Sequence, residues 1–255
     1  MTIARRTLLK GAASLPLAAV LADPLLARAV AATLTEVTLT TAAGATVRAA
    51  LALPAQTPAS AVLLVHEWWG LNDQIKSVAA ELAGRGYMAL AIDLYDGHVA
   101  TTAADARRFM ATVARDPGTA TETLAAWVAW LKAHKRGNGK IGTVGWCFGG
   151  GWSLNASIAA PVEATVIYYG DVRRKARDLA RLEGPVLGHF ATRDRWITRQ
   201  MVAGFEAEMK KAGKSLTAYW YEADHAFANP TQARYDAEDA KLAWTRTLAF
   251  YRETL

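Results

Sequence analysis

Short apolar runs alternate with amphipathic segments along most of the chain. A continuous apolar run is typical of a strand that is buried on both faces of a sheet. Such runs lie at residues 61–66, 87–92, 140–144, 163–169, 185–191 and 216–222. Helical spacing of the apolar residues between the runs predicts helices, which we place at residues 73–83, 103–114, 119–135, 151–160, 198–212 and 232–251.

Ahead of the first run, residues 34–40 and 45–53 alternate or nearly alternate between apolar and polar side chains. Ala43-Gly44 lies between these two segments, which predicts a β-hairpin. Strands that alternate with helices of this length predict an α/β fold with a mostly parallel central sheet and helices on both faces. Neither a repeat nor a long linker divides residues 32–255, so we expect a single domain.

The first 31 residues have the pattern of a targeting signal. Arg5 and Arg6 form a twin-arginine pair, and an apolar stretch follows at residues 11–26. Small residues fit signal cleavage after Ala29 or after Ala31. The alternative is an amphipathic or membrane-anchoring helix, but prolines interrupt the stretch and it is short for a span. We predict a removed Tat-type signal, export to the periplasm or beyond, and no stable membrane anchor.

Charge and cysteine content narrow the classes of partner. The formal net charge is +6, and removal of residues 1–31 leaves 25 bases and 22 acids, a net charge of +3. No run of basic residues interleaved with aromatic residues stands out, so we expect no nucleic-acid partner. The single cysteine excludes an internal disulfide and leaves one thiol for chemistry or packing. We expect a monomer or a weak homodimer.

The segment Gly145-Trp146-Cys147-Phe148-Gly149-Gly150 joins a predicted strand to a predicted helix. A Gly-x-Cys-x-Gly-Gly junction of this kind is the nucleophile elbow of α/β-hydrolases with cysteine in the serine position. The turn holds its central residue in a strained conformation, and its neighbours must be small because a Cβ would collide with the adjoining strand or helix. The alternative is that Cys147 is a small buried hydrophobic residue.

A nucleophile of this kind needs an acid and a histidine that follow it in this order. His225 lies just past the last predicted strand, whereas His189 lies within a strand and is expected to be a satisfied core residue. Asp194 directly follows a strand end and is our choice for the acid that orients His225. The other aspartates after the elbow are Asp171, which is the reserve choice, Asp178, in a charged segment, and Asp224, adjacent to His225.

These residues together resemble the dienelactone hydrolase family, the carboxymethylenebutenolidase-like α/β-hydrolases. The likeness runs from about residue 60 to 230 and rests on the segment 145–150, Asp93-Leu94-Tyr95, Asp194, His225-x-Phe227 and Glu67. It implies an α/β-hydrolase fold, a cysteine nucleophile and a glutamate beside the thiol in the resting enzyme. A nearby carboxylate holds a thiol neutral by like-charge repulsion, and substrate binding would move Glu67 away. Without the resemblance, Glu67 would be an exposed loop acid or part of a salt bridge.

The oxyanion hole is expected from the backbone N–H groups of Phe148 and Trp68. Candidate residues for the substrate pocket are Trp69, Trp146, Tyr95 and Phe227. Tryptophan is frequent in this chain, so an equal alternative is that its tryptophans are ordinary core and lid residues.

The sequence departs from the resemblance at the carboxylate-binding arginines. The family has one arginine shortly after Asp-Leu-Tyr and one shortly after the histidine, where this chain has Asp96-Gly97-His98 and Ala228-Asn229. Neither Asn nor Gly replaces a bidentate guanidinium. Substitutes to consider are Arg107, Arg108, Arg193 and Arg195. The chemistry is therefore more strongly predicted than the substrate.

We predict a hydrolase of small esters or lactones that works by a Cys147–His225–Asp194 triad through an acyl-thioester. The alternatives are a single-cysteine thiol redox or peroxide-handling protein, and a non-catalytic ligand-binding relative. No second cysteine is present to resolve a sulfenic acid, and an intact candidate triad argues against the non-catalytic relative. We expect no cofactor and no metal, because His66-Glu67 lacks the second histidine of a zinc motif.

Overall fold

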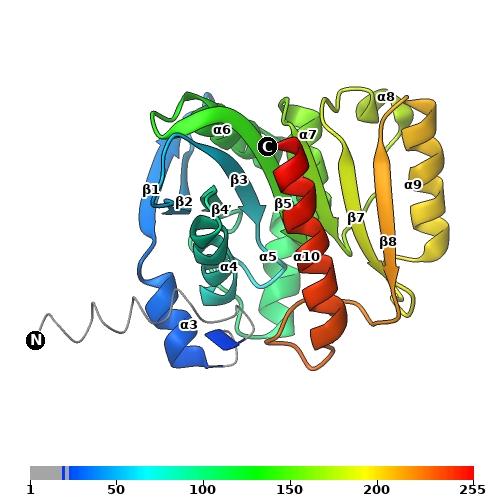
Figure 1. Cartoon of the computed structure of the whole chain (residues 1–255), viewed down its shortest axis with the longest axis horizontal. Helices are drawn as coiled ribbons and strands as arrows, with labels where there is room; N and C mark the ends of the chain where they lie inside the picture. The colour runs from blue at the N-terminus through cyan, green and yellow to red at the C-terminus, as the bar shows by residue number, and fades with distance from the viewer. Residues whose placement is uncertain (1–18, 21–22) are drawn as a thin grey trace, which may run out of the picture.

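The computed structural model describes residues 19–20 and 23–255. Within these residues an eight-stranded sheet forms the centre of the molecule, in the order β1-β2-β4-β3-β5-β6-β7-β8 (Figure 1). The strands are β1 (Thr35–Thr40), β2 (Thr46–Ala52), β3 (Ala59–Val65), β4 (Met88–Ile92), β5 (Gly137–Trp146), β6 (Ala164–Tyr168), β7 (Val186–Ala191) and β8 (Leu216–Tyr221).

The directions of the strands confirm the predicted topology. β1 and β2 form the antiparallel hairpin at one edge, and β2 is also antiparallel to β4. All neighbours from β4 to β8 are parallel. Central strands are covered on both faces, which is why they are continuously apolar. In β3, for example, residues 62–65 are fully buried.

Helices cover both faces of the sheet (Figure 1). The helices α4 (Asp73–Gly84) and α10 (Ala237–Thr254) share one apolar core on one face. The other face packs against α5 (Ala103–Arg115), α6 (Pro117–Ala133), α7 (Phe148–Ala159), α8 (Ala176–Leu179) and α9 (Arg199–Lys211). The predicted helix at 232–251 begins later, at Ala237, because the Asp236 side chain accepts the Asp239 N–H and caps it there.

The predicted signal lies partly outside the described residues, which omit 1–18 and 21–22. Its last part forms α3 (Pro24–Ala31), capped by Asp23. α3 packs against α4, and Ser77 Oγ donates a hydrogen bond to Ala27 O (3.3 Å). Both predicted cleavage sites lie in this helix, and the removal of residues 1–31 stays a prediction. Within the described part of the chain, no helix is both long enough and apolar enough to cross a bilayer.

The loops at the carboxyl ends of the parallel strands carry the chemistry-bearing side chains, as expected for an open α/β sheet. They are Glu67 after β3, Tyr95 after β4, Cys147 after β5, Tyr169 after β6, Asp194 after β7 and His225 after β8. Each of these residues lies within four positions of the end of its strand, so the sheet fixes their relative positions.

Candidate active site

Cys147 occupies a sharp turn between β5 and α7. Its backbone angles are φ 55° and ψ −117°, which a residue other than glycine adopts at a cost of about 1–3 kcal/mol. The Cys147 N–H donates to Tyr168 O (3.0 Å), and Cys147 O accepts from Gly150 N–H (3.0 Å). The neighbouring β6 and the first turn of α7 therefore hold the strained conformation in place.

Two glycines of the elbow are required by close backbone contacts. A Cβ on Gly145 would overlap the carbonyl group of Gly149. A Cβ on Gly149 would overlap the carbonyl oxygens of Val65 and His66, at the end of β3. The predicted reason for small residues on both sides of Cys147 is thereby confirmed, since strand and helix meet at backbone contact.

His225 and Asp194 form a buried pair. His225 Nδ1 donates to Asp194 Oδ2 at 2.6 Å. The other carboxylate oxygen, Oδ1, accepts the N–H groups of Trp196 (2.8 Å) and Ile197 (3.0 Å). The Asp194 side chain is fully buried, and its loop fixes it by these two backbone bonds. The carboxylate is thus rigid and can orient the imidazole ring.

The charge state of His225 follows from its partners. Burial lowers the pKa of His225, but hydrogen bonds to Asp194 and Cys147 outweigh burial and raise it to about 10. An imidazolium is therefore favoured at neutral pH, between the carboxylate of Asp194 and the sulfur of Cys147.

The other candidate acid and the other histidine after the elbow form contacts outside this pair. Asp171, the reserve acid, forms an ion pair with Arg173 (2.5 Å). His189 is inside β7 and contacts Tyr221 Oη (2.8 Å) and Thr247 Oγ1 (3.0 Å). Burial lowers the pKa of His189 to about 3, so it is a neutral, satisfied core residue as predicted.

Glu67 is buried, with 3% of its surface exposed. Its Oε2 accepts from Asn229 Nδ2 (2.6 Å), and its Oε1 accepts from Tyr169 Oη (3.4 Å). Burial raises the pKa of Glu67, while the bond from Asn229 and the charge of His225 oppose the rise. Within the described residues these two are the hydrogen bonds that the carboxylate makes, and its predicted resting place beside the Cys147 thiol stays a prediction.

Asn229 and Tyr169 are site residues that sequence reasoning missed. Asn229 was noted only because an arginine is absent there. Its Oδ1 accepts from the backbone N–H (3.0 Å) and the Oγ1 (2.7 Å) of Thr231, so the amide is held with its NH₂ group toward Glu67. Tyr169 has a positive φ of 37°, uncommon outside glycine, directly after β6. The signal that could have identified Asn229 was a polar residue four positions after His225.

His66 links the loop that carries Glu67 to the Asp-Leu-Tyr loop. Its Nδ1 donates to Glu67 O (2.6 Å), and its Nε2 accepts from Leu94 N–H (3.2 Å). Burial lowers the pKa of His66, so the ring is neutral and can both donate and accept. Asp93 in turn accepts the backbone N–H groups of Tyr95 (2.8 Å) and Gly97. The Asp-Leu-Tyr segment thus shapes the loop beside the nucleophile.

The predicted oxyanion donors lie on either side of this region. Phe148 is the first residue of α7, and Trp68 lies in the loop after β3. Across the described ranges of the chain, neither backbone N–H donates to a protein acceptor. Both groups are therefore available to an acyl oxygen, and α7 adds the positive end of its dipole at Phe148.

Tyr95 packs its ring against Phe148 (5.5 Å between centroids) and edge-on against His66 (4.6 Å). Its hydroxyl is buried and has no hydrogen-bond partner among the residues that the structure describes. Burial raises the pKa of Tyr95, and the charges of Cys147 and Asp93 raise it further. The hydroxyl is thus a donor near the nucleophile without a protein acceptor.

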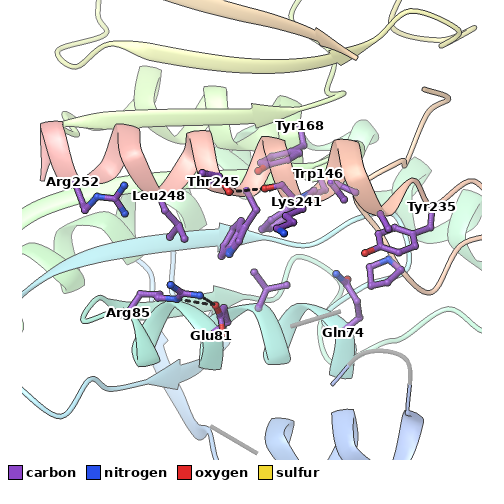
Figure 2. Close-up of a pocket in the computed structure, with 16 residues that line it drawn as sticks. Gln74, Glu81, Arg85, Trp146, Tyr168, Tyr235, Lys241, Thr245, Leu248 and Arg252 are labelled. Carbon is purple, nitrogen blue, oxygen red and sulfur yellow. Dashed lines mark hydrogen bonds and ion pairs between the residues drawn. The ribbon is translucent and has the colours of Figure 1, made fainter. Parts of the chain in front are cut away.

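The other predicted pocket residues differ in their surroundings. Trp69 packs edge-on against Trp68, with ring centroids 4.9 Å apart. Phe227 is fully buried in the core. Trp146 stacks on Tyr168 and lines a groove between α4 and α10 (Figure 2).

Trp196 was not predicted as a pocket residue. It is 57% exposed, and its ring lies edge-on against His225, with 5.1 Å between centroids. It follows Asp194 by two residues, so the loop that supplies the acid also supplies an apolar wall over the base.

The arginines considered as substitutes for the carboxylate-binding pair either form ion pairs with other side chains or are exposed. Arg108 pairs with Asp105 (2.8 Å), and Arg193 pairs with Asp224 (3.4 Å). Arg107 and Arg195 are exposed. Arg234, which the sequence did not single out, lies over the Trp196 ring at 5.3 Å and is near enough to act on the pKa of Glu67.

A family model and curated relatives match most of this chain. The dienelactone hydrolase family model matches residues 47–255. A carboxymethylenebutenolidase of Pseudomonas putida is 29% identical over 220 residues, which cover 81% of this chain and 91% of the relative. Carboxymethylenebutenolidase 1 of Cupriavidus pinatubonensis is 23% identical and covers 83% of this chain and 94% of its own.

A solved structure also shares the fold. It is a dienelactone hydrolase-like promiscuous phosphotriesterase from metagenomic libraries, 23% identical, with a TM-score of 0.78. The match covers 87% of this chain and 98% of the other, which confirms the predicted α/β-hydrolase fold. The curated relatives show a hydrolase of the dienelactone type, acting on lactones or esters. The chain belongs to the dienelactone hydrolase family.

Proposed function

We propose that the protein hydrolyses small esters or lactones with Cys147 as nucleophile, His225 as acid and base, and Asp194 as the group that orients His225. The observation that carries the proposal is the buried Asp194–His225 pair, at 2.6 Å, directed at a cysteine in a strained elbow. Nucleophile, base and orienting acid in one chain of hydrogen bonds are the parts of covalent acyl transfer.

The proposed reaction has two halves. Cys147 gives its thiol proton to His225 as Sγ attacks the carbonyl carbon, and His225 passes that proton to the leaving alkoxide, which leaves an acyl-thioester. His225 then accepts a proton from water as the water attacks the thioester, and returns it to the sulfur as the C–S bond breaks, so that the carboxylic acid product leaves with the thiol restored. The N–H groups of Phe148 and Trp68 bind the oxyanion in both halves, and the loss of one such donor commonly costs about 2.7–4 kcal/mol.

Glu67 is proposed to control the charge of this site. Its buried carboxylate is held by Asn229 and Tyr169, close enough to His225 that the charge of the imidazolium opposes the rise in the pKa of Glu67. A swing toward Cys147 would break the bond from Asn229, and the reverse movement would restore it. Asn229 is therefore the residue that sets the resting position of Glu67.

The substrate class is proposed from Arg234. It is a cation over the ring of Trp196, which itself lies edge-on against His225. A guanidinium in that place favours substrates with a free carboxylate, as a bidentate partner. A screen of ester and lactone pairs with and without a carboxylate tests this. Equal kcat/KM values within each pair, unchanged in Arg234→Gln, would remove the carboxylate from the proposal.

The triad is tested with three variants. Cys147→Ala should abolish ester hydrolysis and leave the circular dichroism spectrum unchanged, while Cys147→Ser keeps some activity on activated esters. Asp171→Asn is the matched control for the acid and should behave as the wild type. Mass spectrometry of the quenched reaction should show an acyl adduct on Cys147. Full activity of Cys147→Ala, or peroxide consumption without ester hydrolysis, would overturn the assignment.

We also propose export through the Tat route. The support is the Arg5-Arg6 pair followed by an apolar stretch and small residues at 27–31. Replacement of both arginines by lysine should keep the protein with its leader in the cytoplasmic fraction, whereas the unaltered chain should be recovered outside it in a shorter form. Identical distribution of the two proteins would count against the proposal.

A further inference from the structure

A groove runs between α4 and α10 on the face of the sheet that these two helices cover (Figure 2). Its volume is about 530 Å³, within the range of small-molecule sites. On α4 it follows Gln74, Val78, Glu81 and Arg85, which lie along one stripe of the helix. The described residues that line it include none of the proposed triad.

The body of the groove is apolar. Trp146 and Tyr168 stack with 5.5 Å between their centroids, and Leu248 contributes from α10. Trp244 also lines the groove, and its Nε1 is buried with no hydrogen-bond partner in the part of the chain that the structure describes.

The charged residues around the groove are mostly positive. Arg85 forms an ion pair with Glu81 (2.9 Å). Lys241 and Arg252 line the groove and have no carboxylate within ion-pair distance among the described residues. An anion therefore complements this rim.

The groove has two different ends. Arg85, with its guanidinium on Glu81, and Arg252 lie on opposite sides of the groove at one end, Trp146, Tyr168 and Tyr235 lie toward the other, and Lys241 lies between them, nearer to Trp146 (Figure 2). Gln74 and Arg85 are eleven positions apart, which corresponds to roughly 16 Å along α4. The shape is an elongated apolar trough with a cationic end.

We propose that this groove binds a medium-chain alkyl carboxylate, with the carboxylate between Arg85 and Arg252 and the chain along Trp244 toward Trp146. An extended chain of about ten carbons fits the roughly 16 Å length. Apolar burial binds the chain, and the unpaired guanidinium of Arg252 selects the charged end over a neutral one. The site lies outside the proposed triad, so the inference does not depend on the proposed function.

The loop after His225 connects the groove to the active site. Ala228 and Pro230 line the groove, while Asn229 between them donates to Glu67 (2.6 Å). A ligand in the groove contacts both neighbours of the residue that holds Glu67. Occupancy is therefore expected to shift the pH profile of ester hydrolysis as well as to give a binding signal.

The test uses sodium decanoate below its micelle concentration, with binding followed by isothermal titration calorimetry and by the fluorescence of the tryptophans in the groove. Saturable binding is expected, with decanol and decyltrimethylammonium bound at least about tenfold more weakly. Ala240→Trp, which fills the groove from α10, should remove binding. Arg252→Gln should weaken it by about tenfold, since a hydrogen bond to a charged group is lost.

Arg107→Gln is the matched control, because Arg107 is an exposed arginine on α5, away from the groove. It should bind decanoate as the wild type does. Equal affinity for decanoate and decyltrimethylammonium would overturn the proposal. Undiminished binding in Ala240→Trp would also overturn it, as would equal losses in Arg252→Gln and Arg107→Gln.

Discussion

Asn229→Ala should destabilise the protein in a strongly pH-dependent way. The substitution removes the 2.6 Å bond from Nδ2 to Glu67 and leaves Tyr169, at 3.4 Å, as the remaining hydrogen-bond donor to that carboxylate in the described structure. A hydrogen bond to a charged group contributes about 1.5–3 kcal/mol, so we expect a loss of about 2 kcal/mol when Glu67 is ionised. That loss raises the pKa of Glu67 by between about one and two units.

The direction of the pH effect follows from linkage. The pKa of Glu67 in the folded protein is already above its unfolded value because of burial, so Glu67 costs stability as the pH rises through this interval. Asn229→Ala raises the pKa of Glu67 in the folded protein further. At high pH, where Glu67 is ionised, Glu67 therefore costs more stability in the variant than in the wild type. Below the unfolded pKa Glu67 is protonated in both states, and only the loss of the neutral bonds to Thr231 remains, about 1 kcal/mol.

Urea unfolding at pH 5 and pH 8 measures this difference. The destabilisation by Asn229→Ala should be larger at pH 8 by between about 1 and 2 kcal/mol. Thr231→Ala is the matched control, because it removes one bond to Asn229 Oδ1 and does not contact Glu67. Its effect should be the same at both pH values. A destabilisation by Asn229→Ala that does not change with pH would refute the assigned role of the Asn229–Glu67 bond.

Three further substitutions test the elbow and its neighbours. Asp194→Asn should lower kcat by between about 10²- and 10⁴-fold. It should also lower the pKa of His225 from about 10, since the carboxylate partner is lost. NMR titration of the imidazole measures this shift, and an unchanged pKa would contradict the pairing. Tyr95→Phe should raise the free energy of unfolding by about 1 kcal/mol, because a buried hydroxyl without a partner is removed. It should also lower kcat/KM, because that hydroxyl lies near Cys147. Lower stability with unchanged kinetics would count against both expected effects. Gly149→Ala should cost more than about 3 kcal/mol of stability, since its Cβ would overlap the backbone of β3; thermal denaturation checks this, and a cost below about 1 kcal/mol would be inconsistent with the contact.

Much of the fold could be predicted from sequence because buried strands have a local signature. Each continuous apolar run became a strand of the sheet, and the segment 145–150 could be identified from its glycines, its cysteine and its place between a strand and a helix. Asp194 was preferred to Asp171 because it directly follows a strand end, and the order of the strands supplies the physical reason. β7 lies beside β8, so the loop after β7 reaches His225, whereas Asp171 follows β6, one strand further away. Residue type alone does not show how far each aspartate lies from His225.

The contacts that were missed have no local pattern. Asn229 meets Glu67 across 162 residues of sequence. Trp196 follows charged residues in a short loop, where no sequence pattern marks it as a site residue. The turn after Asp194 brings its ring over His225. Side-chain contacts between loops depend on how neighbouring strands end, and neither apolar periodicity nor a motif records this.

The sheet order also determines when in synthesis the thiol gains its partners. Cys147 is translated well before His225 and Asn229, which lie beyond β8 at the far edge of the sheet. The loops after the last strand must dock before Glu67 and His225 are held, and closure across 162 residues is the slow, non-local kind of folding event. An incomplete nascent chain therefore contains Cys147 without His225, the base that we propose for it, and the two meet only when the C-terminal part has been made and has folded onto the sheet.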